Sequence, residues 1–434
     1  MKKDPIDREK KFGRLATESA IIRSLSLVST TINQIATPVI FIHYSNIYNL
    51  GFWTLVLSVG SFAAILDLGL IQVMTTASIQ AFAKNESDIG RNILNDLLNY
   101  LIYLVVGILI LLLILQSTFG SIWTLSQYNV SQLVALCFFN YSLGILVRYY
   151  EGAFRALGKL FGLKLLVLSS YADLTILLSN VILGVSFTLI LLEMIGMKII
   201  LVAILSFKFQ RNSSIFTLKR PMSAFLGILP YQKLGISFLG MPLGYLVLNE
   251  TSNIVVSSFL GLEMLGIFTI LKSLSAIFRQ VSGIFILSMT PRFTELISME
   301  KFEIAQMVFL RMKNFLIVLN GLILMFLLST FSFFAQHISK LESVGYETYV
   351  VFLALAFLDI WWIIESTVIV SANQHKGLTL RFLYSSVTSC LIGCALLFQF
   401  GVSAMAIGTL VIDIVLIPYS IKIRKRILKS SPIN

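Results

Sequence analysis

The sequence predicts an all-α polytopic membrane protein with twelve transmembrane helices, and its composition and one recurring pattern support this class. Only 12% of the 434 residues are charged, 57% are hydrophobic, and the mean hydropathy is +0.89. A soluble domain carries roughly 25% charged residues, which keep its surface hydrated. Apolar stretches of about 20 residues, long enough to cross a bilayer as helices, recur along the chain. The composition therefore excludes a soluble enzyme, a secreted disulfide scaffold and a disordered chain.

Twelve segments have the length and hydropathy of membrane spans. They are residues 20–43, 53–81, 93–116, 131–154, 163–181, 186–207, 233–259, 266–290, 306–330, 347–372, 379–400 and 402–421. Only a short stretch separates the fifth from the sixth, so eleven spans, with the termini on opposite sides of the membrane, are the alternative. Residues 1–19 are too highly charged for a signal peptide, and the first span is expected to stay in the chain.

The distribution of lysine and arginine favours the even number of spans. If the N-terminus is cytoplasmic, 26 of the 33 Lys and Arg residues fall in the tails, cytoplasmic loops and helix mouths, and only Lys340 falls in an exported loop. Cytoplasmic loops of membrane proteins carry this excess of positive charge. We therefore predict that both termini are cytoplasmic. The same distribution accounts for the net charge of +12 without a nucleic-acid partner.

A weak internal repeat predicts how the spans are organised. Residues 49–54 (NLGFWT) align with residues 264–269 (MLGIFT) at an offset of 215, which is close to half the chain. We expect an N-terminal six-helix lobe (1–207), a cytoplasmic linker (208–222) and a C-terminal six-helix lobe (223–434). Transporters built from two such repeats bind cargo between their halves near the membrane midplane and expose it alternately.

The sequence offers no catalytic, metal or cofactor site. The stretch from Gly152 to Leu160 resembles a phosphate-binding loop, but five residues instead of four separate its glycines and no Ser or Thr follows its lysine. The remaining candidate ligands have no metal-ligand or disulfide spacing: His43, His337, His375, Cys137, Cys390 and Cys394. We predict that the protein is not an enzyme and that an ion gradient, rather than ATP, drives its activity.

Basic residues inside the spans predict a cationic cavity. An ionised side chain in mid-bilayer costs roughly 2.5–3.5 kcal/mol on insertion scales and needs a partner or a water-filled space. Helical spacing places each of these residues on a polar face of the first, fourth or eighth span. They are Arg23, Arg148, Lys272 and Arg279. We expect them to bind an anionic group, because guanidinium groups pair well with phosphate.

Other interpretations of these charges remain open at this stage. Arg23 and Arg148 lie near the cytoplasmic mouth and could extend to lipid head groups. Glu151 could pair with Arg148 or Arg155 as a structural contact, and Lys198 could pair with a neighbouring helix.

Carboxylates within the spans are candidates for coupling transport to H⁺ or Na⁺. Asp67, Glu250 and Asp359 are best placed for this role. Each could equally neutralise one of the cations of the cavity.

Two stretches resemble a known family. Residues Leu50 to Leu55 and Leu66 to Leu70 resemble the second-span signature of Wzx-type polysaccharide (O-antigen or capsule) repeat-unit flippases. Residues Asn253 to Phe268 are similar to the junction of the seventh and eighth spans in that family. These flippases belong to the multidrug/oligosaccharidyl-lipid/polysaccharide exporter (MOP) superfamily, and the resemblance implies a MATE-like fold.

The resemblance also implies a function. Family members move undecaprenyl-diphosphate-linked oligosaccharides from the cytoplasmic to the outer leaflet of the bacterial inner membrane, for O-antigen and lipopolysaccharide biosynthesis. It implies ion-coupled alternating access, a cationic cavity containing Arg148, Lys272 and Arg279, and membrane lipids and other polysaccharide assembly proteins as partners.

Three alternatives are weaker. A cation-coupled multidrug antiporter of the same superfamily would favour acidic and aromatic walls over deep cations. A membrane polysaccharide polymerase would need a substantial exported loop, which the predicted topology lacks. A flippase for lipid-linked peptidoglycan precursors would usually have two further spans.

Overall fold

The computed structural model describes residues 5–84, 86–119, 124–125, 128–157, 159, 161–213, 217, 219–332, 345–372, 374 and 376–429. Within the helices some side chains are not described, among them that of Arg23. The predicted positions Lys340, His337 and His375 lie outside the described residues. The described chain is helical apart from one pair of two-residue strands and short connections.

The secondary structure follows in chain order. The elements are α1 (Pro5–Tyr44), α2 (Ile47–Ser61), the 3-10 helix η1 (Phe62–Ile65), α3 (Leu70–Ala83), α4 (Ser87–Phe119), β1 (Thr124–Leu125), β2 (Tyr128–Asn129), α5 (Val130–Ala156), α6 (Phe161–Ile182), α7 (Phe187–Ser213), α8 (Pro221–Leu246), the π-helical turn η2 (Val247–Thr251), α9 (Ser252–Leu260), α10 (Leu262–Ser298), α11 (Phe302–Ser329), α13 (Gly345–Ser371), α14 (Lys376–Phe400) and α15 (Ser403–Lys429). Strands β1 and β2 pair antiparallel. The predicted all-α polytopic class is confirmed.

The helices correspond closely to the predicted spans. Eleven helices in the described part of the chain are long and apolar enough to cross a membrane. They correspond to every predicted span except the seventh (233–259), which is formed by α8, η2 and α9 in succession. The cytoplasmic position of both termini stays a prediction.

The second predicted span, 53–81, is wrong as one continuous helix. The chain forms α2 and η1, turns at Leu66–Gly69, and continues as the shorter apolar helix α3. Leu68 and Gly69 have positive φ angles of 51° and 69°, which end a right-handed helix. The interruption follows directly after Asp67.

By their contacts, the residues group into two compact units. Unit 1 comprises Met1–Ile22 and Leu55–Pro242, and unit 2 comprises Arg23–Thr54 and Leu243–Asn434. The unit boundaries lie within α1, α2 and α8, whereas the predicted lobes 1–207 and 223–434 follow chain order around the linker 208–222. That predicted division stays a prediction.

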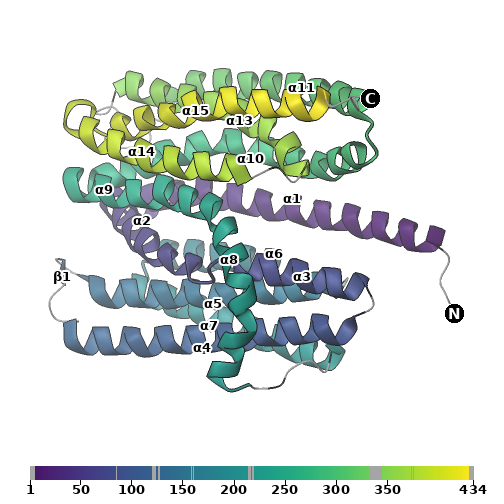
Figure 1. Cartoon of the computed structure of the whole chain (residues 1–434). Coiled ribbons are helices and arrows are strands. Elements are labelled where there is room, and N and C mark those ends of the chain that lie inside the picture. Colours follow the sequence, from purple (N-terminus) through teal and green to yellow (C-terminus); the bar gives the residue numbers. More distant parts are fainter. Residues whose placement is uncertain are drawn as a thin grey trace. The chain divides into compact units, whose positions relative to one another are not determined.

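Helices α3, α4, α5 and α7 form the core of unit 1 (Figure 1). Three buried aromatic side chains meet there, with the ring of Phe209 lying 6.3 Å from that of Tyr149 and 5.6 Å from that of Phe154. Both pairs are edge-to-face, a favoured arrangement of aromatic rings. The contacts fix α7, and with it the start of the predicted linker, against α5.

In unit 2, α13 packs against α10 and α15, and α15 packs against α14 (Figure 1). The fully buried side chains of Phe278, Phe309 and Ile364 come from three different helices of this group. Because α10 contributes a fully buried face through Phe278, its polar residues face other directions, including the site described below.

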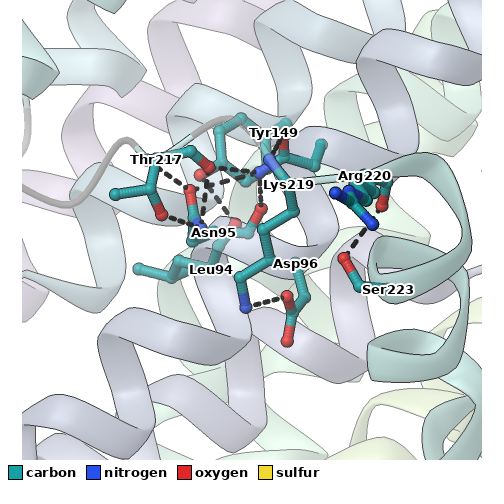
Figure 2. A network of polar contacts seen from close by, with 9 residues as sticks. Leu94, Asn95, Asp96, Tyr149, Thr217, Lys219, Arg220 and Ser223 are labelled. Carbon is teal, nitrogen blue, oxygen red and sulfur yellow. Dashed lines mark hydrogen bonds and ion pairs between the residues drawn. The ribbon is translucent and has the colours of Figure 1, made fainter.

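The chain after α7 is fastened to α4 by polar side chains (Figure 2). The Asn95 amide donates to the backbone oxygen and hydroxyl of Thr217, at 3.1 and 2.9 Å, and its oxygen accepts from the Thr217 backbone at 3.2 Å. The Asn99 amide nitrogen donates to the Thr217 oxygen, and its oxygen accepts from the Lys219 backbone, both at 3.0 Å. Lys219 also forms an ion pair with Asp96. The end of the predicted linker is therefore held in a fixed position on α4.

We predict that Asn99→Ala loosens the end of the linker. The variant leaves the Lys219 backbone N–H without its acceptor and removes one of the two amide hydrogen bonds to the Thr217 oxygen, a loss of about 1–3 kcal/mol where the group is buried. Limited trypsin digestion of the purified protein should cleave the 208–220 region faster than in the wild type. Asn92→Ala, at an exposed position on the same helix, is the control and should digest at the wild-type rate. Equal rates for Asn99→Ala and the wild type would contradict the fastening role.

Candidate functional site

Unit 2 contains a cavity of about 800 Å³, lined by residues of α1, α2, α8, η2, α9, α10 and α13. A smaller cavity of about 70 Å³ lies on the other side of three shared lining residues, Asn249, Lys272 and Arg279. The larger volume lies within the range of small-molecule sites, roughly 300–1,000 Å³. The structure therefore brings together two of the four predicted cavity cations, Lys272 and Arg279.

The π-helical turn η2 positions Lys272. Its ammonium donates to the backbone oxygen of Asn249 at 2.8 Å and to the side-chain oxygen of Asn253 at 3.0 Å. A π-helical turn displaces backbone carbonyls from the regular helical ladder, and such turns are common at functional sites. Both acceptors are neutral, so these contacts orient Lys272 without cancelling its charge.

Glu250, a predicted coupling residue, also lines the larger cavity. Its carboxylate is an electrostatic neighbour of Lys272 and accepts a long hydrogen bond of 3.4 Å from the Asn253 amide. No salt bridge within 4 Å joins Glu250 to a described cation. The carboxylate therefore moderates the positive charge at this end of the site.

Arg279 is the least compensated cation of the site. It lies two turns along α10 from Lys272 and lines both cavities. Its guanidinium lies 6.0 Å from the ring centroid of Tyr245. Among the described residues, none forms a hydrogen bond or a salt bridge with this group. A guanidinium has five N–H donors in a planar fork that suits carboxylate and phosphate groups, and here these donors are available to a ligand.

Two carboxyl groups lie beside the smaller cavity. Asp359 on α13 lines it, accepts a hydrogen bond of 3.2 Å from the Trp362 indole, and is an electrostatic neighbour of Arg279. The carboxyl group of Asp413 on α15 lies beside that of Asp359 and is 4% exposed. No amine, amide or hydroxyl of the described residues donates to either oxygen of Asp413. Asp413 was not among the predicted coupling residues.

Helix α1 contributes Leu27, Thr30 and Gln34 to the larger cavity. Gln34 accepts a hydrogen bond from Gln280 of α10. Ser26, Thr30, Asn33 and Thr37 follow Arg23 at helical spacing on one polar face of α1. Of these four, only Thr30 lines the cavity, and Thr37 donates to the side-chain oxygen of Asn33. The side chain of Arg23 lies outside the described residues, so its role stays a prediction.

Arg148 and Asp67 belong to unit 1 and meet at the break after α2. The Arg148 guanidinium donates to the backbone oxygen of Ala64 at 3.2 Å and is an electrostatic neighbour of the Asp67 carboxylate. The Asp67 carboxylate accepts from the Gly69 backbone at 3.3 Å. Their contacts stabilise a helix interruption, and their predicted roles in cargo binding and coupling stay predictions.

Other intramembrane charges are paired within unit 1. The carboxylate of Glu151 lies 3.8 Å from Arg155, which confirms one of the two pairings open from the sequence. Lys198 on α7 lies 3.7 Å from Asp173 on α6, a structural contact between helices.

A buried ionic network in unit 2 was not predicted from the sequence. Glu365 on α13 is fully buried, and its two oxygens accept from Lys313 on α11 at 2.6 Å and from Arg424 on α15 at 2.7 Å. The predicted topology places Lys313 at a cytoplasmic helix mouth and Arg424 in the C-terminal tail. An acidic residue near the cytoplasmic end of the tenth predicted span was the available signal, but its partners lie 52 and 59 residues away.

Comparisons with known proteins identify the fold. No protein-family model and no curated protein matches the sequence. An inward-facing multidrug resistance MATE family transporter of the MOP superfamily is similar with a TM-score of 0.64 at 14% identity, over 92% of this chain and 99% of that one. An outward-facing transporter of the same description has a TM-score of 0.62 at 14% identity, over 96% of both chains.

A third similar structure is a MOP superfamily transporter from Pyrococcus furiosus, described as having a binding pocket of reverse polarity that suggests a different function. It has a TM-score of 0.58 at 14% identity, over 96% of both chains. At such identities the likeness establishes the fold alone. The predicted MATE-like fold is thus confirmed.

We predict that Glu365→Gln strongly destabilises the protein. The substitution leaves Lys313 and Arg424 buried without their counter-ion, and breaking a buried ion pair costs about 3–5 kcal/mol. The melting temperature in detergent should fall well below that of the wild type. Glu295→Gln, which breaks the exposed pair with Arg292, is the control and should change it little. An unchanged melting temperature for Glu365→Gln would show that the network contributes nothing to stability.

Proposed function

We propose that this protein is a flippase that moves undecaprenyl-diphosphate-linked oligosaccharides from the cytoplasmic to the outer leaflet of a bacterial inner membrane. The observation that carries the proposal is the guanidinium of Arg279, which forms no salt bridge within 4 Å with a described residue and lines a cavity of about 800 Å³ together with Lys272. Two cations on one face of a membrane helix call for an anionic ligand, because their charge is costly in hydrocarbon.

The chemistry of a lipid-linked oligosaccharide fits these residues. Its diphosphate would accept hydrogen bonds from the Arg279 fork and from the donor of Lys272 that neither Asn249 nor Asn253 uses. Its sugars would replace water at the amide and hydroxyl groups of Gln280 and Thr30. The polyprenyl tail can remain in lipid while the polar head crosses, so the cavity has to hold the head group only.

Asp359 is the coupling residue that these surroundings favour. Two neighbouring carboxyl groups in a low-dielectric environment hold a proton or a cation between them more readily than two free charges. Asp359 and Asp413 form such a pair beside Arg279. Anionic cargo bound to Arg279 would weaken the attraction between Arg279 and the Asp359 carboxylate. Binding of H⁺ or Na⁺ to Asp359 would then be linked to binding of the cargo.

A cation-coupled multidrug antiporter of the MOP superfamily is the second candidate. Two observations favour it: multidrug transporters share the fold, and the larger cavity also contains Glu250 and Tyr245, which suit a cationic aromatic drug. The Pyrococcus furiosus transporter is a precedent within this fold for a pocket of different polarity. Because its cations outnumber its carboxylates, the larger cavity favours anionic cargo.

Deletion of the gene in its native host separates the two candidates. If the protein is a flippase, lipid-linked oligosaccharide should accumulate in the cytoplasmic leaflet, where exported glycan-modifying enzymes cannot reach it. If it is a multidrug antiporter, drugs should accumulate in the cell while lipid-linked intermediates keep their normal level. Radiolabelled lipid extracts and drug-uptake measurements on the same strains distinguish these outcomes.

We predict that Arg279→Ala and Lys272→Ala lower glycan export at unchanged protein level, and that Arg279→Lys restores part of it. The reason is loss of charge-assisted contacts to the diphosphate, each worth about 1.5–3 kcal/mol. Surface glycan and membrane protein level are measured in a complemented deletion strain. Arg292→Ala is the matched control, since Arg292 lies on the same helix but is exposed and paired with Glu295. Wild-type export in both alanine variants would show that Lys272 and Arg279 do not bind the cargo.

We also predict that export depends on ion gradients. Collapse of the proton and sodium gradients should stop export in wild-type cells, whereas depletion of ATP at maintained gradients should not. Asp359→Asn should lose the gradient dependence, because the amide cannot exchange a proton or balance a cation. Asp88→Asn, at an exposed position at the start of α4, is the control and should keep it. Export that persists without gradients in the wild type would refute ion coupling.

A further inference from the structure

The two copies of the internal repeat contact each other through equivalent residues. The hydroxyl of Thr269 donates to that of Thr54 at 3.2 Å, and these residues are related by the repeat offset of 215. Gly51 approaches the backbone of Leu262, and Gly266 approaches the backbone of Ile47. The two contacts are equivalent, because the offset of 215 relates Gly51 to Gly266 and Ile47 to Leu262. The starts of α2 and α10 therefore cross with local two-fold symmetry.

Only glycine fits at this crossing. A methyl group on Gly51 would overlap the carbonyl oxygen of Leu262 and lie 3.0 Å from the backbone nitrogen of Gly266. A methyl group on Gly266 would overlap the carbonyl oxygen of Ile47. Small residues allow helix backbones in a membrane to approach closely. The flanking side chains of Leu50, Trp53 and Leu265 are buried, so the crossing leaves little room for water or cargo.

The crossing lies at one end of the larger cavity. Thr54 and Thr269 line the cavity, and its lining continues along α10 to Leu287. From Thr269 to Leu287 this stretch of helix is about 27 Å long. Gly266, one turn before Thr269, does not line the cavity. The predicted topology, with both termini cytoplasmic, places the starts of α2 and α10 on the exported side. The path that leads from Arg279 to the exported side thus ends at the crossing.

We infer that the crossing of α2 and α10 at Gly51 and Gly266 is the outer gate of the transport path, and that it opens when cargo leaves for the exported side. This inference rests on the proposed function and names the element that controls release. The contacts suit a gate. One hydroxyl–hydroxyl hydrogen bond contributes only about 1 kcal/mol, and the remaining attraction is close packing of two backbones, which is lost once they separate.

A reversible cross-link tests the gate. Thr54→Cys and Thr269→Cys are combined in a chain with Cys137, Cys390 and Cys394 replaced by alanine, and the disulfide is formed with copper phenanthroline. We expect cross-linking to abolish export and dithiothreitol to restore it. The matched control is Thr348→Cys with Ser403→Cys, whose hydroxyls are 2.9 Å apart at the starts of α13 and α15. That cross-link joins two helices that pack against each other, and export should continue.

A second measurement needs no knowledge of the cargo. Ser273 lines the larger cavity one turn beyond Thr269, and Ser273→Cys can be labelled from outside intact cells with a membrane-impermeant thiol reagent. Gly266→Ala should hold the crossing apart and raise outside labelling relative to the parent. Gly321→Ala is the control, because a methyl group there would meet nothing within 4 Å. Unchanged labelling in a folded Gly266→Ala variant would overturn the gate.

The two experiments separate the gate from the proposed function. Export that continues in fully cross-linked Thr54/Thr269 protein would overturn the gate and leave the flippase proposal standing. If the deletion strain accumulates drugs instead of lipid-linked oligosaccharide, the cargo is wrong, but cross-linking should still block drug export. A Gly266→Ala variant that fails to fold leaves the cross-link as the deciding test.

Discussion

The architecture of unit 2 depends on keeping two positive charges of α10 inside a membrane. Lys272 is stabilised by the backbone oxygen of Asn249 and the side chain of Asn253, which the π-helical turn η2 brings within reach. Arg279, two turns further, has only the face of Tyr245 and the more distant Asp359. These two charges require polar surroundings inside the membrane. The π-helical turn in the seventh span, the polar residues of α1 and the cavity provide them.

The same chemistry is used structurally elsewhere in unit 2. Glu365 compensates Lys313 and Arg424 at hydrogen-bonding distance and leaves no charge for a ligand. Arg279 has no carboxylate within 4 Å among the described residues. Whether a charged side chain has a structural or a functional role therefore depends on its surroundings and not on its residue type. A cation beside a cavity that has no close counter-ion gains most when an anion binds.

The spans and the charged face of α10 could be predicted because each depends on local pattern. Hydropathy locates a span, and helical spacing placed Lys272 and Arg279 on one face of the eighth span, where both line the smaller cavity. Features that depend on backbone conformation or distant partners could not be predicted. The break at Leu68 and Gly69 interrupts an apolar stretch, the π-helical turn has no hydropathy signal, and the pairing of Asp359 with Asp413 requires knowing that α13 packs against α15.

The two repeat copies are alike at the exported end and differ at the depth of the site. Gly51 and Gly266 are equivalent, but Lys272 and Arg279 correspond to Leu57 and Ala64 in the first copy. There the helix tightens and breaks, and the guanidinium bound to the Ala64 backbone comes from Arg148 of α5 instead. The second copy continues as one helix of 37 residues that carries its own cations. Symmetry is thus kept where two backbones must meet closely and open together, and it is lost where a single asymmetric ligand must be held by charge.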